Sequence, residues 1–402
     1  FVEIFSKWKP DVFVDTHTSD GADYPYVMTL ITTQLSKLHP PLSSFVKKEM
    51  EPALYKAMAE AGYEMIPYVD KMGETPLEGI RDFLETPRYS TGYAALFNTI
   101  GFTTEAHMLK PFRKRVLATY QFLRSVVDFT GQNADRIEEI RKEADRQLVE
   151  QRRFLLNWKL DSTRFDTLRF KGYTAKYISS EVTGLTRIRY DRAAPYEKEI
   201  PHYRYFTARD TLVAPYAYML PAAWAEAVKR LQVNGIEMHR LARDSILEVQ
   251  VYYIAHYNTI SKPYEGHYLH TDVQLKAEMQ RINFHRGDYL IPTKQPGKRY
   301  IIETLEPNAP DSYFAWNFFD GILQQKEWFS DYPFDDKAKA ILENDHKLNR
   351  DFELKKANDR EFASNKWAML GYIYKHSEWY ERSAMRYPVG RILKVISLPL
   401  AD

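Results

Sequence analysis

Apolar and polar residues alternate in short runs along the first part of the chain, a pattern that predicts β-strands. The run at residues 11–17 (DVFVDTH) places Phe13, Asp15 and His17 on one face of a strand, with two valines and a threonine on the other. Further runs of this kind occur at residues 25–32, 64–69 and 100–107. We interpret these runs as strands of one sheet.

Between these strands the apolar positions recur at helical spacing. This spacing covers residues 42–61, 92–99 and 110–127. Strands that alternate with helices favour an α/β domain, with a mostly parallel or mixed sheet and flanking helices. In such sheets the chemistry gathers at the carboxyl ends of the strands, and His17 and Glu105 both lie at or near a strand end.

From about residue 160 the pattern changes to strands rich in β-branched and aromatic residues, bounded by Gly, Pro or Asp. It predicts a β-rich, sandwich-like domain, interrupted by one helix over residues 221–235, and then a helical tail rich in aromatic residues. We therefore divide the chain into an α/β domain, a charged helical linker, a β-rich domain and a helical, aromatic extension. The predicted boundaries are residues 1–130, 131–160, 161–310 and 311–402.

Composition narrows the function without defining it. The chain has 56 basic and 54 acidic side chains, so its net charge of +2 predicts no general attraction to nucleic acid or anionic membranes. No apolar run is long enough for a transmembrane helix. The absence of cysteine excludes disulfides and thiolate metal sites. Sequence patterns of nucleophilic serine hydrolases, phosphate-binding loops, dinucleotide-binding folds and His-Glu-x-x-His zinc helices are also absent.

The stretch VDTHTSDGADYPY, residues 14–26, ends a predicted strand with a histidine and then turns sharply. A metal-binding histidine usually has its second ring nitrogen held by a carboxylate or a carbonyl, and Asp15 lies on the same strand face as His17. The Asp20-Gly21 turn lets the backbone fold away and leaves the imidazole open to a cavity. The alternative is a structural histidine that is hydrogen-bonded locally.

Glu105 lies near the end of an otherwise apolar and hydroxyl-bearing strand. A carboxylate in that position is costly unless it faces a cavity or is paired. One interpretation is a general base that acts on a metal-bound water. The other is a salt bridge to a basic side chain such as Arg113 or Arg115.

Taken in order, the strand that ends in His17, the loop PRYSTGY at residues 87–93 and the strand that carries Glu105 resemble a known family. They are similar to the C-terminal half of the peptidase domain of zinc carboxypeptidases of the carboxypeptidase A type. The resemblance covers roughly residues 1–130. The stretch from Tyr300 to Tyr332 is similar to the extension that follows this domain in large bacterial members.

The resemblance implies roles for individual residues. His17 matches a zinc ligand of the family, and Glu105 matches the glutamate that serves as general base and proton shuttle. A tyrosine in the loop before that glutamate closes over the substrate, and Tyr89 is the first match for it, with Tyr93 second. Arg88 is a loose match for a contact to a substrate carboxylate.

The chain departs from the family in its first part. The family supplies two earlier zinc ligands from a His-x-x-Glu motif and binds the substrate's terminal carboxylate with an Asn-Arg pair, both before the ligand that matches His17. None of the 11 histidines of this chain is followed by Glu at the third position. A catalytic zinc needs about three protein ligands. We therefore expect the chain to be the C-terminal part of a longer enzyme, with the other ligands upstream of Phe1.

The resulting hypothesis is a zinc-dependent metallocarboxypeptidase with one zinc ion, which removes residues from the C-termini of peptides outside the cytoplasm, in a bacterial periplasm or as a secreted protein. One alternative is a non-catalytic protein with a degenerate peptidase domain that binds a peptide or a glycan. Another is a different metallohydrolase that uses His17 and Asp20 together with distant histidines.

Overall fold

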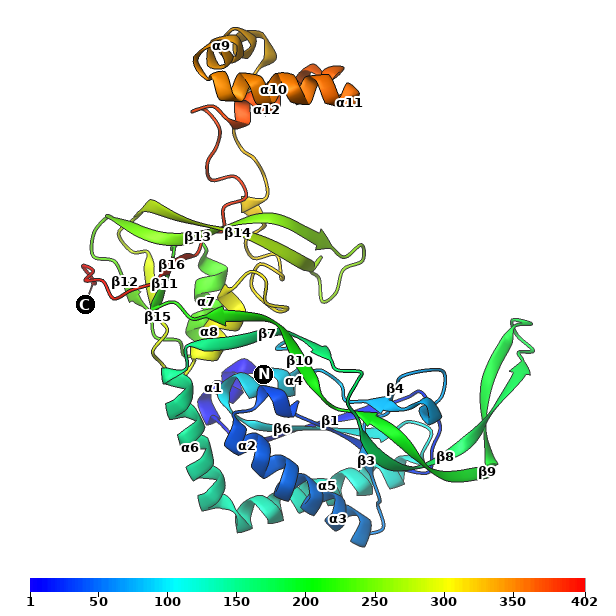
Figure 1. Cartoon of the computed structure of the whole chain (residues 1–402). Coiled ribbons are helices and arrows are strands. Elements are labelled where there is room, and N and C mark those ends of the chain that lie inside the picture. The colour runs from blue at the N-terminus through cyan, green and yellow to red at the C-terminus, as the bar shows by residue number, and fades with distance from the viewer. Residues whose placement is uncertain (402) are drawn as a thin grey trace.

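The structure, a computed structural model, describes residues 1–401 and combines mixed sheets with helices (Figure 1). An α/β region lies at one end, a β-rich region in the middle and a small helical module at the other end. The predicted α/β fold followed by a β-rich region is confirmed. None of the helices in residues 1–401 combines the length and the apolar character that crossing a membrane requires.

The first region is built on a four-stranded mixed sheet with the order β1-β6-β2-β3. Strand β6 is central, parallel to β1 and antiparallel to β2, while β2 runs parallel to the short β3. The bounds of these strands are Val12–Ser19 for β1, Met28–Thr32 for β2, Ile66–Pro67 for β3 and Ile100–His107 for β6. The mixed sheet thus places β1 and β6, which carry the predicted site residues, side by side.

The two faces of this sheet pack against different layers. Val12 and Val14 of β1 contact a core that includes Phe102 of β6 and Phe122. The helices that contribute to this layer are α2 (Pro40–Phe45), α3 (Glu51–Glu60) and α5 (Phe112–Gln132). On the other face, Phe13 packs near the short helices α1 (Val2–Trp8) and α4 (Ser90–Ala94). The alternation of residues 11–17 therefore divides β1 between two cores.

The helix predicted over residues 42–61 is interrupted. Between α2 and α3 lies a π-helical turn, Val46–Met50, directly before the start of α3. Pro52 occupies the first turn of α3 and has no N–H group to donate to the preceding turn. The wider π-helical turn lets the backbone continue past the residue that cannot donate a hydrogen bond. The spacing of apolar residues alone does not predict this turn.

Helix α6, Ala134–Glu150, occupies most of the segment predicted as a charged linker. Ile137 and Ala144 are buried against the first region, and Arg141 forms a salt bridge to Asp11 with an N–O distance of 2.7 Å. The helix therefore lies on the α/β region through a narrow apolar stripe, while its other faces remain charged.

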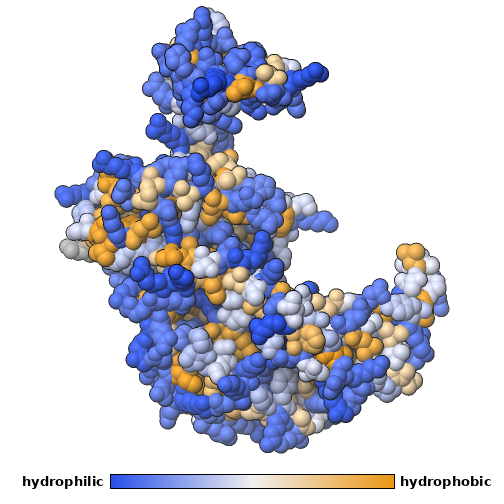
Figure 2. Space-filling model, viewed as in Figure 1, coloured by the Kyte–Doolittle hydropathy of each residue, from blue (hydrophilic) through white to orange (hydrophobic). Residues whose placement is uncertain are grey.

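The strands of the β-rich region are divided among three sheets. Strands β7 (Arg153–Leu160) and β10 (Phe206–Val213) form a two-stranded sheet. The long hairpin of β8 (Asp166–Ser179) and β9 (Thr186–Tyr203) extends from the first region through pairing with β5 (Ile80–Arg81), which in turn pairs with β4 (Asp70–Lys71). Figure 2 shows an apolar spot at the hairpin tip, where Val182 is 94% exposed.

The third sheet is six-stranded and antiparallel, with the order β12-β15-β11-β16-β13-β14. Its strands are β11 (Ala217–Leu220), β12 (His239–Arg240), β13 (Ser245–Thr259), β14 (His270–Phe284), β15 (Tyr289–Pro292) and β16 (Gly390–Ile392). Helices α7 (Ala225–Val233) and α8 (Lys298–Leu305) contribute to the core on one face.

That core is shared by the two regions. Leu231 of α7 and Ile301 of α8 belong to the same apolar cluster as Phe5, Tyr93 and Leu96 of the α/β region. Because apolar burial is the main favourable contribution to folding, the two regions stabilise each other.

The helical module has a separate core. It consists of α9 (Asp331–Asn344), α10 (His346–Asn358), α11 (Arg360–Ala363) and α12 (Lys366–Lys375). Phe334, Phe352, Phe362 and Tyr374 form the centre of its apolar cluster. Figure 1 shows this module at the end of two connecting segments, apart from the sheets.

Candidate active site

Parallel pairing of β1 and β6 brings His17 and Glu105 together. The register aligns His17 with Glu105 and Asp15 with Thr103. Residues aligned in neighbouring strands project from the same face of a sheet, so the imidazole and the two carboxylates lie on one face. The structure thus gives His17 and Glu105 the proximity that the metallopeptidase hypothesis requires, while their catalytic roles stay predictions.

Asp15 links the histidine to the loop before Glu105. Its Oδ2 atom lies 3.0 Å from His17 Nε2 and accepts a hydrogen bond of 2.5 Å from Ser90 Oγ. Burial by itself raises the pKa of Asp15, but the hydrogen bonds from Ser90 and His17 and the charge of His17 outweigh it and hold the pKa below its usual value. Asp15 is therefore a carboxylate that orients the imidazole, as metal-binding histidines often require.

Glu105 has the environment of a reactive carboxylate. Burial raises its pKa and the charge of Asp15 adds to the increase, while His17 acts in the opposite direction. Its Oε2 atom is buried and has no hydrogen-bond partner within residues 1–401. In the same range the structure contains no salt bridge from Glu105 to Arg113, Arg115 or another cation. A carboxyl group with a raised pKa and an unpaired acceptor oxygen suits a general base.

Glu85 is a third carboxyl group on this face, next to Asp15 and Glu105, and sequence reasoning missed it. It is 4% exposed, and its Oε1 atom accepts a hydrogen bond of 3.4 Å from Thr103 Oγ1, two residues before Glu105 in β6. Burial raises the pKa of Glu85 to about 8, although the nearby Lys37 opposes the increase. Glu85 lies in a loop, where no periodic pattern distinguishes a buried acid from an exposed one.

Lys37 accompanies Glu85 in the interior. Its ammonium group donates a hydrogen bond to the backbone carbonyl of Glu85, and burial lowers the pKa of Lys37 to about 8. Arg299 of α8 in turn donates to the backbone carbonyl of Lys37. The loop before Glu105 is thereby connected to the β-rich region through buried charged groups.

The two candidate tyrosines have different surroundings. Tyr93 is buried in the shared core, and its hydroxyl donates a hydrogen bond of 2.5 Å to Asn234 Oδ1. Tyr89 is 36% exposed and packs edge-on against Phe83, with ring centroids 5.2 Å apart. The exposure of Tyr89 suits contact with a substrate, whereas the hydroxyl of Tyr93 is already engaged by the chain itself.

Arg88, predicted to contact a substrate carboxylate, binds a carboxylate of its own chain. Its Nε atom lies 2.8 Å from Asp311 Oδ1, and its Nη2 atom lies 2.7 Å from the same oxygen. The guanidinium group also lies over the rings of Tyr264 and Trp316, at 5.4 and 5.3 Å from their centroids. A substrate carboxylate would therefore compete with Asp311 for this side chain.

The described residues do not assemble a zinc site. Within residues 1–401 no three His, Asp or Glu side chains are grouped to hold a metal ion. His17 fits the role of a single imidazole ligand supported by Asp15. The alternative site of His17, Asp20 and distant histidines is likewise not assembled within this range. A catalytic zinc bound by His17 would need further ligands from outside this range.

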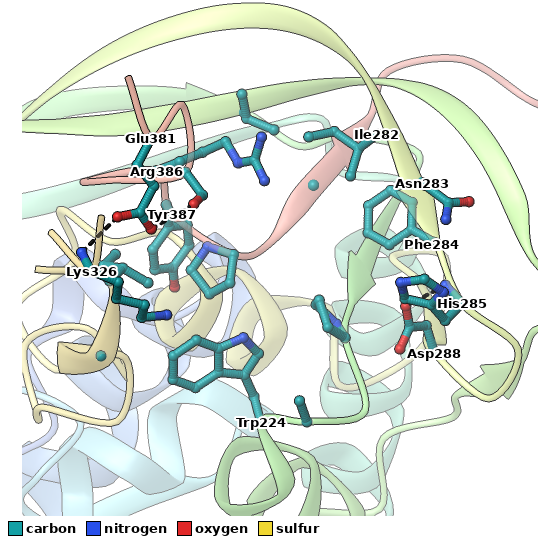
Figure 3. A pocket seen from close by; sticks show the side chains of 18 of the residues that line it. Trp224, Ile282, Asn283, Phe284, His285, Asp288, Lys326, Glu381, Arg386 and Tyr387 are labelled. Atoms are coloured by element: carbon teal, nitrogen blue, oxygen red, sulfur yellow. Dashed lines mark hydrogen bonds between the residues drawn. The ribbon is translucent and has the colours of Figure 1, made fainter. Parts of the chain in front are cut away.

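The β-rich region contains a separate cavity of about 310 Å³ (Figure 3). Trp224, Phe284 and Tyr387 contribute aromatic rings to its wall. Figure 3 shows Arg386 and Tyr387 on one side of this cavity and Ile282 and Phe284 on the other. An apolar wall with a few charged groups is typical of a ligand pocket.

Comparison with known proteins relates part of the chain to carboxypeptidases. Carboxypeptidase 2 of Trichophyton tonsurans is 30% identical over 102 residues, which cover 25% of this chain and 19% of that protein. Carboxypeptidase 2 of Trichophyton rubrum is 29% identical over 102 residues, again 25% of this chain and 19% of that protein. The probable carboxypeptidase 2 of Arthroderma benhamiae is 30% identical over 97 residues, or 24% of this chain and 18% of that protein.

The chain thus spans about a fifth of the length of these fungal relatives. No protein-family model and no solved structure matches it. The comparisons support a relation to carboxypeptidases in general terms.

Proposed function

We propose that the chain is the part of a zinc-dependent metallocarboxypeptidase that carries the general base, and that the intact enzyme hydrolyses C-terminal peptide bonds. The observation that carries this proposal is the register of β1 and β6, which aligns His17 with Glu105 and leaves a buried oxygen of Glu105 without a partner within residues 1–401. The relation to carboxypeptidases supports the same reaction class.

In this proposal Glu105 removes a proton from the attacking water and transfers it to the leaving amine. Its burial favours proton uptake, because the neutral carboxyl group needs less solvation than the anion. Asp15 orients His17 through the 3.0 Å contact, and Tyr89 covers the bound peptide from the loop. The peptide substrate would approach this face of the sheet.

The proposal includes one zinc ion, for which this chain would supply only some of the protein ligands. His17 would be one protein ligand, and a segment outside residues 1–402 would supply the others, since catalytic zinc has about three. Bound zinc polarises a carbonyl and lowers the pKa of water. We further propose that the enzyme works outside the cytoplasm, in a periplasm or as a secreted protein.

The test uses the protein expressed from the whole open reading frame of its gene. Release of C-terminal residues from a set of peptides is measured together with the zinc content. Glu105→Gln should lower turnover about 10²–10⁴-fold with zinc retained, because only the proton-transfer group is changed. A matched control is Glu64→Gln, which removes an exposed ion pair to Lys171 (2.6 Å). If Glu105→Gln hydrolyses peptides as fast as the unaltered enzyme, Glu105 is not the base.

A second candidate function is favoured by the cavity of Figure 3. In it, the peptidase region is inactive and the β-rich region binds a peptide whose apolar end fills the aromatic cavity, with Arg386 near its carboxylate. Titration with a short peptide that ends in an apolar residue should then give saturable heat of binding. Trp224→Ala should abolish that heat, and an amidated peptide should bind more weakly. Hydrolysis of the same peptide by the longer protein would exclude this candidate.

A further inference from the structure

We propose that Asp311 is a positioning residue of the candidate active site, which acts through Arg88 to hold Tyr89 in place over the substrate. The stretch around Asp311, in the C-terminal extension, would then form part of the substrate-binding side of the enzyme. This inference rests on the proposed peptidase function, since it gives a role to a side chain that contacts the bound peptide.

The first observation is the fork between Asp311 and Arg88, two residues 223 positions apart in the chain. Oδ1 of Asp311 accepts from Arg88 Nε at 2.8 Å, and Oδ2 accepts from the backbone N–H of Arg88 at 3.0 Å. One carboxylate therefore fixes both the side chain and the backbone of Arg88. Such charge-assisted, two-point contacts set orientation as well as contributing energy.

The carboxylate of Asp311 is itself held firmly. Asp311 is 8% exposed, and Trp316 Nε1 donates to Oδ1 at 3.0 Å. The guanidinium group of Arg88 lies over the rings of Trp316 and Tyr264, whose centroids are 6.1 Å apart. Stacking and ion pairing together suit arginine specifically, because its guanidinium group is planar and forked.

The second observation is that the same loop is tied to the catalytic face two residues later. Ser90 Oγ donates to Asp15 Oδ2, which contacts His17. Tyr89 lies between these two attachments, and its ring remains partly exposed. A short segment fixed at both ends leaves the intervening side chain few orientations.

The backbone around Tyr89 is also closely packed. The N–H of Tyr89 donates to Thr86 O at 3.0 Å, and the carbonyl of Tyr89 accepts from Tyr93 N at 2.8 Å. A Cβ atom added at Gly92 would lie 2.1 Å from Thr86 O, so the helix start fits tightly against the turn. A displacement of Arg88 would therefore move the turn that carries Tyr89.

The tip of the β13–β14 hairpin lies beside the residue that precedes Tyr89, since the guanidinium group of Arg88 is 5.4 Å from the ring centroid of Tyr264. Burial raises the pKa of Tyr89, and the neighbouring Tyr264 adds to the increase. Tyr264 lies between β13 and β14, where it pairs with His267 through the backbone. The β-rich region thus contributes the Tyr264 ring next to this loop, in addition to the contacts of Asp311 with Arg88.

The test compares variants of the longer enzyme with a peptide substrate. Asp311→Asn removes the charge with almost no change in shape, and it should raise KM about tenfold while kcat changes by about twofold or less. In a Tyr89→Ala background the same substitution should have no further effect on KM, because both changes act through one side chain. Arg88→Lys, which keeps the charge but loses the fork, should resemble Asp311→Asn.

A matched control is Lys298→Met, which removes another buried contact between the two regions, from Lys298 Nζ to Val149 O (2.8 Å). Hydrogen exchange of residues 84–92 provides a readout without activity. Exchange there should be faster in Asp311→Asn and unchanged in Lys298→Met.

The outcomes separate this inference from the function beneath it. If the unaltered enzyme hydrolyses peptides but Asp311→Asn changes neither KM nor exchange in the loop, the positioning role is wrong and the peptidase function stands. Additive effects of Asp311→Asn and Tyr89→Ala on KM would also overturn it. If no peptide is hydrolysed but the loop exchanges faster in Asp311→Asn, the proposed function fails and Asp311 anchors the loop for another ligand.

Discussion

The sheet face around Glu105 and the Asp311–Arg88 ion pair both contain buried carboxyl groups. The two places differ in how many hydrogen-bond partners these carboxyl oxygens have. Within residues 1–401, one oxygen of Glu105 and one of Glu85 have no hydrogen-bond partner. Asp311 is surrounded by donors from Arg88 and Trp316. A buried polar atom without a hydrogen-bond partner destabilises the folded protein. Its presence therefore indicates a catalytic role or a partner outside the described residues, whereas a carboxylate with all its hydrogen bonds formed indicates a structural role. Asp311 thus uses its oxygens to hold the loop that carries Arg88, whereas Glu85 and Glu105 each keep one oxygen without a partner in the described residues.

The largest effect is expected when the ion pair between Arg88 and Asp311 is removed. Arg88→Ala leaves Asp311 buried without its cation, which should lower the free energy of unfolding by about 3–5 kcal/mol. Urea denaturation monitored by tryptophan fluorescence would measure the loss. The double variant Arg88→Ala/Asp311→Ala should recover part of it, since the uncompensated charge is removed. A loss below about 1 kcal/mol would indicate that the pair behaves like a surface ion pair.

The next effect concerns Glu85 and depends on pH. Its pKa is about 8 in the folded protein, against 4.5 for a glutamate in water, so the folded state binds more protons between these values. The contribution of Glu85 to stability is therefore present below about pH 4.5 and is lost as the pH rises through 8. Glu85→Gln, which stays neutral, should make the protein relatively more stable at pH 8 than at pH 5.

We expect this difference to be about 3 kcal/mol, less than the shift alone would give, because Lys37 loses one of its acidic neighbours in the variant. Unfolding in urea at both pH values, for the unaltered protein and the variant, measures it. Glu64→Gln, at an exposed ion pair, is the control and should show almost no pH dependence. An equal effect of Glu85→Gln at both pH values would mean that Glu85 is ionised throughout.

A smaller effect is expected where Asp15 supports His17. Asp15→Asn keeps the shape but removes the charge beside Nε2, and it should lower zinc affinity or activity of the longer enzyme about 10–100-fold. Competition with a chelator measures the affinity. Ser90→Ala removes the other hydrogen bond to Asp15 and should lower it less. Unchanged affinity in Asp15→Asn would mean that Asp15 does not orient a zinc ligand.

The smallest effect distinguishes the two tyrosines. Tyr93→Phe removes the buried hydrogen bond to Asn234 and should reduce stability by about 1 kcal/mol. Tyr89→Phe, at a partly exposed ring, should change stability less and KM more. Thermal unfolding and peptide kinetics on both variants would show the contrast. The opposite result would make Tyr93 the tyrosine that covers the substrate.

The elements with strong patterns were predictable from the sequence. The strand expected at residues 100–107 is observed as Ile100–His107, and the one at residues 11–17 as Val12–Ser19. Their side chains point alternately to the two faces of the sheet, and this period of two residues can be read from the sequence. The proximity of His17 and Glu105 also followed from strand ends that meet at one edge of a sheet.

The rest depends on contacts between distant loops. Glu85 lies in a loop, where no period of 2.0 or 3.6 residues reports its burial. The partner of Arg88 is 223 residues away, so the sequence around PRYSTGY suggests a substrate contact instead. The helix at residues 134–150 is mostly charged, and only three of its residues are buried against the rest of the protein. So few apolar positions do not stand out in the sequence.

The apolar cluster that joins Phe5 and Tyr93 to Leu231 and Ile301 limits how the gene can be divided. A truncation after the α/β region would place these aromatic side chains in water, and the shortened polypeptide would be prone to aggregate. For the same reason, the β-rich region could not be deleted without exposing the shared core. Any shortened version should retain the chain at least through β16.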